Sequence, residues 1–392
     1  MKVNNQFIVS GYIFDKTNNA EISLDKMIQR ISVKKDFNIN IFPMFVVDLQ
    51  VNYDIREILR KNNINLVLNV YEYNMADEID DSANFNPVAT SQSFSTTLKI
   101  FDKNIRSLDM KKDKDNENNE MTSQLFNIQL SGIPENLYNK NNTIINTVYN
   151  KASNNEILID LLASDNTNLY FDPSDNSDRL ETLLIPPLSL SNAIAYLQNN
   201  YGLYDSNYKL FFDTNATYLL KEFNADRLSK NKLSINVISQ NSISDSSIYE
   251  ELDVDENENL QKIVKEDPII ITNYDVASNI LGGNAIYGSY DANFNLVTRQ
   301  YTHDKNETKI RYFWNDNDKD IFEKMHQNIQ YRVGSLVLEN ISPRLFSLLT
   351  QIEIDSPNDN IRGSYNIQSL RFSISTGNFK NYSSQIVLTF SK

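Results

Sequence analysis

The chain has 392 residues, of which 40% are hydrophobic and 11% aromatic, so it is long enough for two or three globular domains with a large core. It contains no cysteine, which excludes disulfide frameworks, thiolate zinc sites, iron–sulfur clusters and cysteine nucleophiles. A formal net charge of −14 argues against a general nucleic-acid binder and against binding to anionic membranes, since both need clustered Lys and Arg.

The first residues, MKVNNQFIVSGYIFDK, show neither the apolar region nor the cleavage site of a secretory signal. No stretch approaches the roughly 20 apolar residues of a membrane span. We therefore expect synthesis in a cytoplasm and no stable membrane association.

Short apolar runs in the first third of the chain predict a sheet crossed by one helix. The clearest strand is residues 64–73, where Leu66, Leu68, Val70 and Glu72 share one face. Asp54 is expected to cap a short helix with an apolar face formed by Ile55, Ile58 and Leu59. Further strands are expected at residues 6–14, 44–49 and 93–101.

The local signals agree best over residues 183–223. Pro186 and Pro187 are expected to end the preceding element, because neither donates a backbone N–H. Ser191 then predicts a helix N-cap, and Gly202 predicts a left-handed residue after the helix. Residues 209–212 and 217–220 predict a β-hairpin, and the tyrosines nearby are expected to be core residues: Tyr201, Tyr204, Tyr208 and Tyr218.

The remaining elements follow from shorter patterns. Strands are expected at residues 125–130, 233–238, 269–271, 309–314 and 333–338, with a hairpin over residues 287–301. Gly132 to Pro134 is expected to end the first of these strands. Helices are expected at residues 157–163, around 260–264, at 321–329 and after Pro343, and loops at 110–121 and 239–259. Two amphipathic strands, around residues 370–374 and 386–390, end the chain.

Metal and phosphate motifs are incomplete wherever they begin. Asp316, Asp318 and Asp320 match positions 1, 3 and 5 of an EF-hand loop, but Ile321 replaces the required Gly and Gln327 the required Glu. Asp253, Asp255 and Asn257 fail in the same way, with Glu258 in the glycine position. The glycines of residues 282–288 have no phosphate-loop spacing and predict a turn. We expect no metal and no cofactor.

Catalytic motifs are also missing. The two histidines, His303 and His326, are expected to be surface residues, and neither a GxSxG elbow nor an HExxH motif occurs. With 51 acidic residues, the sequence cannot nominate a carboxylate pair for glycoside cleavage. The sequence therefore predicts no catalytic, cofactor-binding or metal-binding residue.

Two stretches carry a resemblance to a known family. Residues 186–220, with the pattern "L..A..YL...YG.Y" followed by "LFFD....YLL", are similar to the baseplate or tail hub proteins of contractile-tailed bacteriophages. Gly363-Ser364-Tyr365 with the strand up to Phe372, and residues 386–390, resemble the strands that close the second barrel of that family. The match covers about a quarter of the chain and rests on residue types rather than on a signature motif.

The resemblance implies a β-rich α+β fold with two related β-barrel-like domains carrying inserted helices and loops. The first barrel would use residues 39–101, and the second residues 210–220, 309–314 and the C-terminal strands. The expected domains are residues 1–125, a connecting domain at 126–208, and residues 209–392 with an inserted segment around 239–306.

By the same resemblance, three subunits would form a ring that joins the sixfold tail tube to the threefold central spike and lets DNA pass. Implied partners are the tail tube protein, the central spike protein and other baseplate proteins. The protein would be a virion component without enzymatic activity, made in the host cytoplasm. Two alternatives stay open: a cell-wall glycan hydrolase of the tail with an unrecognised carboxylate pair, and a β-rich receptor-binding or adhesin module.

Overall fold

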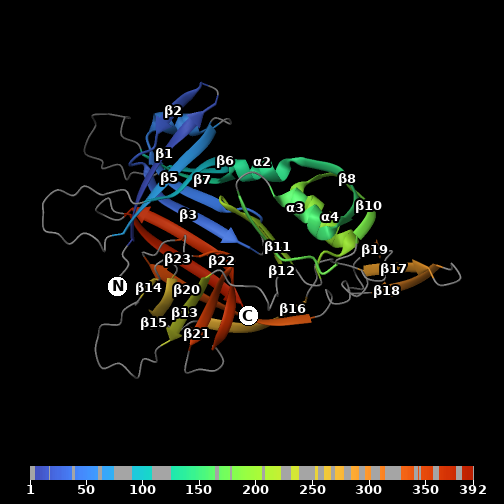
Figure 1. Cartoon of the computed structure of the whole chain (residues 1–392). Coiled ribbons are helices and arrows are strands. Elements are labelled where there is room, and N and C mark those ends of the chain that lie inside the picture. Colours follow the sequence, from blue (N-terminus) through green and yellow to red (C-terminus); the bar gives the residue numbers. More distant parts are fainter. Residues whose placement is uncertain are drawn as a thin grey trace, which may run out of the picture. The chain divides into compact units, whose positions relative to one another are not determined.

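The computed structural model describes most of the chain and divides it into two compact units. The first unit is Met1–Tyr138, Ser229–Thr272 and Val333–Lys392, and the second is Asn139–Leu228 and Asn273–Arg332 (Figure 1). The described residues are 5–16, 18–37, 40–60, 64–74, 91–107, 125–163, 167–176, 179–204, 208–221, 231–237, 252–254, 260–265, 270–277, 284–290, 296–301, 310–313, 328–339, 343, 346–355, 362–376 and 382–391.

A 15-stranded sheet dominates the first unit. Its strands come from both ends of the sequence and from its middle. They are β1 Asn5–Asp15, β2 Ala20–Ser23, β3 Ile28–Asp36, β4 Met44–Val51, β5 Ile64–Asn74, β6 Ser91–Ser107, β7 Phe126–Pro134, β13 Asn231–Val237, β14 Leu252–Val254, β15 Leu260–Lys265, β16 Ile270–Ala277, β20 Asn328–Glu339, β21 Thr350–Asp355, β22 Gly363–Thr376 and β23 Tyr382–Ser391.

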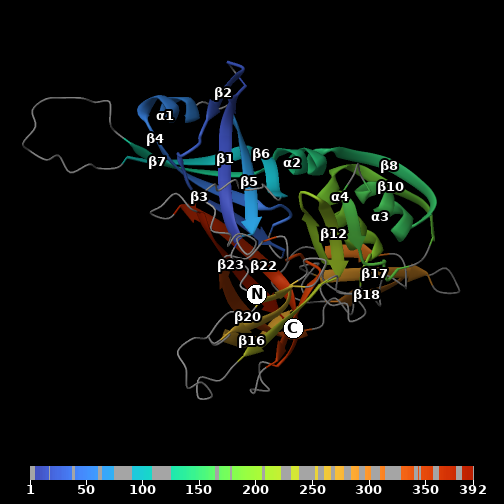
Figure 2. The ribbon, with the colours of Figure 1, turned by 60° about the vertical axis from the view of Figure 1, so that its left-hand side comes forward.

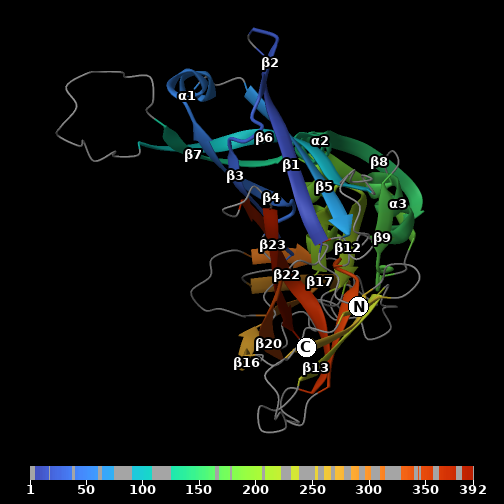
Figure 3. The ribbon, with the colours of Figure 1, turned by 90° about the vertical axis from the view of Figure 1, so that its left-hand side faces the viewer.

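Eight of these strands pair in a closed circuit, in the order β22, β3, β4, β7, β6, β5, β1, β23 and back to β22. Every pairing in the circuit is antiparallel, and the link between β1 and β23 is the single pair Phe7 and Tyr382. β1 and β5 run side by side (Figure 3), and on the other side of β1 the pairing order continues with β23 and β22. The strands of the circuit therefore have neighbours on both sides.

Strands β22 and β23 also belong to a second group of paired strands. β22 pairs with β3 through Ser369–Ser375 and with β21 through Gly363–Asn366. From there the sheet continues through β13 to β15 and β14, and on the other side from β23 to β20 and β16. One pair of long strands thus connects the circuit to the rest of the sheet.

Alternating side chains explain the core of the circuit. In β5, Leu66, Leu68, Val70 and Glu72 are all buried, as the sequence predicts, and β4 alternates in the same way along Met44–Val51. In the two predicted C-terminal strands, the alternating residues Leu370, Phe372, Ile374, Ile386 and Leu388 are buried. Phe7 of β1 meets Phe372 of β22 edge to face, with ring centroids 5.6 Å apart.

The predicted first helix exists, but Asp54 is not its cap. Helix α1 spans Tyr53–Leu59, and the Oδ1 atom of Asn52 accepts a hydrogen bond from the backbone N–H of Ile55 at 3.0 Å. Asp54 lies in the first turn instead. Asn52 and Asp54 are both suitable N-cap residues, and Asn52 is the one whose backbone is extended, as an N-cap requires.

The second unit holds a two-stranded ribbon, three-stranded sheets and two helices. The ribbon pairs β8 Ile144–Ser153 with β10 Arg179–Ser189, and α3 Asn154–Leu162 and α4 Leu190–Tyr201 lie against one of its sides (Figure 2). One small sheet is β9 Asn168–Phe171, β12 Ala216–Lys221 and β11 Tyr208–Phe212. Another is β18 Leu296–Tyr301, β17 Asn284–Tyr290 and β19 Ile310–Phe313. Helix α2, Glu135–Asn142, runs across the division between the units.

The central helix and hairpin are confirmed, with one correction at the cap. Gly202 ends α4 in the left-handed conformation with φ 61°, and β11 pairs with β12 as predicted. Ser189, not Ser191, is the N-cap residue, and its side chain makes no capping hydrogen bond. The Oδ1 atom of Asn141 instead accepts from the backbone N–H of Ser191 at 2.9 Å. A residue 50 positions away thus satisfies the helix terminus.

Two predicted strand ends are wrong. β10 continues through Pro186 and Pro187, where its register with β8 shifts, so the prolines sit at an irregularity that needs no regular ladder bonds. β7 continues through Gly132 to Pro134, because the absence of a side chain at Gly132 lets the backbone of Lys99 approach closely.

Two predictions of secondary and tertiary structure fail in the second half of the chain. Residues 260–264 form strand β15, not a helix, because they pair in parallel with β13. The hairpin β11–β12 pairs with β9 and strand β19 pairs with β17, so neither joins the C-terminal strands in a second barrel. Non-local pairing decided both cases.

Other predictions stay open. The three consecutive domains stay a prediction, and so does the first barrel over residues 39–101. The predicted loop at 110–121 and most of that at 239–259 lie outside the described residues, as do 321–327 of the predicted helix, whose last residues Asn328 and Ile329 begin β20.

Candidate functional site

The described residues contain no group of three or more His, Asp or Glu side chains arranged to hold a metal ion. Asp316, Asp318, Asp320, His303 and His326 lie outside these residues, and of the predicted second acidic triplet only Asp253 falls within them, in strand β14. Within the same part of the chain, no helix has the length and apolar character to cross a membrane.

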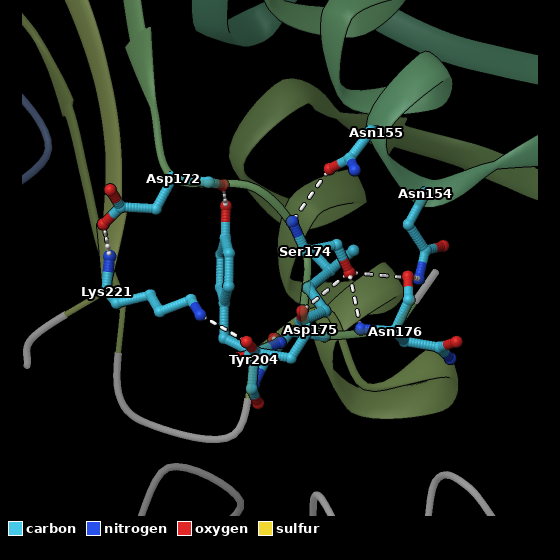
Figure 4. A network of polar contacts seen from close by, with 10 residues as sticks. Asn154, Asn155, Asp172, Ser174, Asp175, Asn176, Tyr204 and Lys221 are labelled. Atoms are coloured by element: carbon cyan, nitrogen blue, oxygen red, sulfur yellow. Dashed lines mark hydrogen bonds and ion pairs between the residues drawn. The ribbon is translucent and has the colours of Figure 1, made fainter. Parts of the chain in front are cut away.

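The best-defined polar cluster of the second unit surrounds residues 172–176 (Figure 4). The backbone carbonyl of Asp172 accepts from the Tyr204 hydroxyl at 2.8 Å, and its carboxylate accepts from the backbone N–H of Lys221 at 2.8 Å. The backbone N–H of Ser174 donates to Asn155 at 2.8 Å, and its hydroxyl donates to the carbonyl of Leu203 at 2.7 Å. These bonds fix the segment to α3, to β12 and to the residues after α4.

The same cluster holds the end of α4. The side-chain amide of Gln198 is fully buried and makes two hydrogen bonds with the backbone of Tyr204, of 3.1 and 3.0 Å. Lys221 forms an ion pair with Asp175, and its Nζ atom lies 5.8 Å from the centre of the Tyr204 ring. The groups of this cluster bond mainly to backbone atoms, so we assign it a structural role.

Asn154 is the exception in the cluster. Its side chain is fully buried, and its Nδ2 atom lies 3.5 Å from both the Ser174 hydroxyl and the carbonyl of Asn176. Its Oδ1 atom has no hydrogen-bond partner. A fully buried amide oxygen of this kind suits a hydrogen bond from an internal water.

The tyrosines of the central stretch are explained by packing. Tyr204 and Tyr218 are buried, as the sequence predicts, while Tyr201 and Tyr208 are half-buried. Burial raises the pKa of Tyr208 to about 12. Burial, followed by electrostatic interactions with Asp213 and Tyr170, raises the pKa of Tyr218 even further. These hydroxyls stay protonated at neutral pH and are unsuited to proton transfer there.

The ribbon β8–β10 has two different sides. On one side Leu183 and Ile185 are fully buried, and the hydroxyl of Tyr149 donates to Asp160 of α3 at 2.6 Å. On the other side Val148 lies directly opposite Leu184, and the hydroxyl of Thr182 donates to Asn150 at 3.3 Å across the strands. The helices therefore cover one side and leave the other open.

We call this open side the ribbon face. By the strand register it comprises Ile144, Asn146, Val148, Asn150, Ala152, Leu180, Thr182, Leu184 and Ser189. Ile144 is 63% exposed, and Val148 and Leu184 are each 53% exposed. None of these nine residues is charged, in a chain where 22% of the residues are charged. The sequence pattern did not reveal this face, because the exposed apolar residues of β8 do not alternate with polar ones in the way of a half-buried strand.

Comparison with known proteins places the chain in a family. A sequence model of the family described as "Bacteriophage PBS1 gene 109 protein" matches residues 4–389. The chain belongs to this family. No curated protein sequence matches it. The resemblance to bacteriophage proteins that the sequence predicts is thereby confirmed, and the β-rich fold class is confirmed by the structure.

Several solved structures resemble the family member described here. The tail protein from Neisseria meningitidis MC58 has a TM-score of 0.47 at 10% identity, over 97% of this chain and 96% of that one. The 43 kDa tail protein of prophage MuSo2 from Shewanella oneidensis has a TM-score of 0.43 at 8% identity, over 97% and 98%. An E. coli component of the type VI secretion system, described as similar to T4 tail proteins, has a TM-score of 0.39 at 7% identity, over 93% and 73%.

Proposed function

We propose that this chain is a structural protein of a bacteriophage tail or baseplate, and that it is the hub whose trimeric ring joins the tail tube to the central spike. The observation that carries the proposal is the family match, which extends over residues 4–389 and therefore concerns the whole fold. The resemblance of residues 186–220 and of the C-terminal strands to tail hub proteins points in the same direction.

The fold supports a structural role. Each strand of the circuit of eight antiparallel strands has a paired neighbour on both sides, although β1 and β23 share a single residue pair. Pairing on both sides limits uncontrolled edge pairing of a β-rich subunit. The long strands β22 and β23 continue from this circuit into a second group of strands. A body of this kind gives a ring two β-rich parts per subunit, and three subunits then present six such parts to the tube.

The charge of the chain supports passage of DNA without retention. Lys and Arg side chains hold phosphates, whereas a formal net charge of −14 leaves a ring lumen little tendency to do so. The proposed partners are the tail tube protein, the central spike protein and other baseplate proteins. We propose no catalytic role, and we place the protein in the virion after synthesis in the host cytoplasm.

The native mass of the purified chain, measured together with negative-stain images, tests this function. We expect a species near three times 45.3 kDa with a central opening. The measurement is repeated after the tail tube and spike proteins of the same phage are added, because the ring can require a partner to form. A strict monomer in every sample, at high concentration, would contradict the ring.

A further inference from the structure

We propose that the ribbon face is covered by a second copy of this chain, as one side of the contact between neighbouring subunits. The inference rests on the proposed ring, and it names a surface that the ring would use. It concerns the outer side of β8 and β10 only, whose inner side packs on α3 and α4 (Figure 2).

The exposed apolar side chains of this face have no role within the second unit's core. Leu183 and Ile185 already fill the covered side of β10, while Val148 and Leu184 stand opposite each other on the open side. Ile144 lies on the same side, four residues before Val148, and is exposed even further. Covering the exposed part of three such side chains removes apolar surface from water, which favours association.

Electrostatics selects the occupant. Nucleic acid or an anionic lipid surface needs Lys or Arg, and the ribbon face has none. A basic partner would gain from carboxylates, and the face has none of these either. A second copy of this chain carries the same formal net charge of −14, so two copies repel each other. The repulsion is smallest where the contacting surfaces carry no charged side chains. An uncharged apolar face suits that approach.

The size of the face fits one part of a larger contact. Two paired strands of about ten residues span roughly 33 by 10 Å, which is about 330 Å². A stable interface usually buries about 800 Å² on each partner. The ribbon face is thus too small to hold a dimer alone, and it contributes to a head-to-tail contact that closure of a ring completes.

Paired charge substitutions test the inference. Val148→Glu with Leu184→Glu places two carboxylates on the ribbon face. Ile159→Glu with Ile8→Glu is the matched control, because those side chains are similarly exposed, on α3 and on β1. Native mass and circular dichroism are measured for each. We expect the first variant to keep its fold and to need at least tenfold more protein to form trimers, with the control unchanged.

Thiol labelling gives a readout that does not depend on a destabilising charge. Because the chain has no cysteine, Val148→Cys and Ile159→Cys each introduce a single reactive group. In the trimer we expect a maleimide to label position 148 at least tenfold more slowly than position 159. In samples diluted to monomers the two rates should become similar.

The outcomes separate this inference from the proposed function. Loss of trimers in the Val148→Glu, Leu184→Glu variant alone, with protection of position 148, supports it. A trimer that survives this variant, or an equally fast reaction at position 148, overturns the ribbon face as a contact and leaves the ring standing. Dissociation of the control variant as well also overturns it. A wild-type chain that stays monomeric with its partners present overturns the ring itself.

Discussion

Gly132 allows two neighbouring strands of the circuit to approach at the point where their register changes. A Cβ atom at this position would lie 2.9 Å from the carbonyl oxygen of Lys99 and 3.0 Å from the Ile100 side chain. The pairing of β6 with β7 shifts between Ile100 and Asp102, so Phe101 is an extra residue, 56% exposed. The glycine and the bulge are two parts of one feature.

Gly132→Ala is therefore expected to lower the free energy of unfolding by about 1–3 kcal/mol, because the added methyl group meets the backbone carbonyl oxygen of Lys99, which cannot rotate away. Urea unfolding followed by circular dichroism measures the change. Ser131→Ala, one residue earlier in β7 and half-buried, is the control and should have an effect below about 0.5 kcal/mol. Equal free energies of unfolding for the two variants would contradict the prediction, because β6 and β7 would then accommodate the added methyl group without loss of stability.

Helix α3 begins with a complete capping box. The Ser153 hydroxyl accepts from the backbone N–H of Glu156 at 3.3 Å, and the Glu156 carboxylate accepts from the backbone N–H of Ser153 at 2.8 Å. Arg179 of β10 reaches the same carboxylate at 3.0 Å. The bonds with Ser153, first through its backbone and then through its side chain, and the charge of Arg179 lower the pKa of Glu156 below its usual value.

A lowered pKa in the folded state means that the stabilisation by Glu156 is present above the ordinary pKa of 4.5 and is lost as the pH falls through the folded value. Glu156→Gln is expected to be less stable than wild type at pH 7, and the difference should shrink below pH 4.5. Thermal unfolding at a series of pH values measures this. Glu181→Gln, which removes a charge from β10 outside the capping box, is the control. A difference that does not depend on pH would contradict the role of the carboxylate.

The elements that sequence reasoning found are those whose signals are local. Helix α4, the hairpin β11–β12 and strands β5, β22 and β23 carry their own alternation, caps and turns. Strand β3 was not predicted, because a register shift between Ile28 and Arg30 breaks its alternation. Strand β15 was predicted as helix, because its pattern was read without its parallel neighbour β13.

The candidate site was less accessible to prediction than the fold. The cap of α4 at Asn141 and the cluster around Ser174 join segments that lie far apart in the sequence, and no local pattern indicates such contacts. The ribbon face was not predicted from the sequence, for a different reason. Val148 and Leu184 are ordinary strand residues, and only the position of α3 and α4 shows which side of the ribbon is left uncovered.

At the scale of the whole molecule, the circuit joins the two ends of the described chain. Phe7 and Phe372 are both buried, and their rings meet edge to face at 5.6 Å. The Nε atom of Arg371 donates to the Ser32 hydroxyl at 3.3 Å, across 339 residues of sequence. Side chains of β1 and β22, from opposite ends of the sequence, therefore share one core.

We expect a double-mutant cycle of Phe7→Leu and Phe372→Leu to give a coupling energy of about 0.5–1.5 kcal/mol, because each single variant already removes the ring contact. The free energies of unfolding of the wild type, both single variants and the double variant provide the measurement. Strictly additive effects would mean that the two ends of the chain stabilise the circuit independently.

The closed circuit also sets an order of events during synthesis. Strands β1 and β3 leave the ribosome early, whereas their neighbours β22 and β23 leave it more than 300 residues later. At about 5–20 residues per second this delay lasts roughly 20–70 s. For that time the edges that later pair with β22 and β23 face solvent. Nascent chains therefore avoid aggregation only if they associate slowly with one another, or if a chaperone covers these edges until the last two strands arrive.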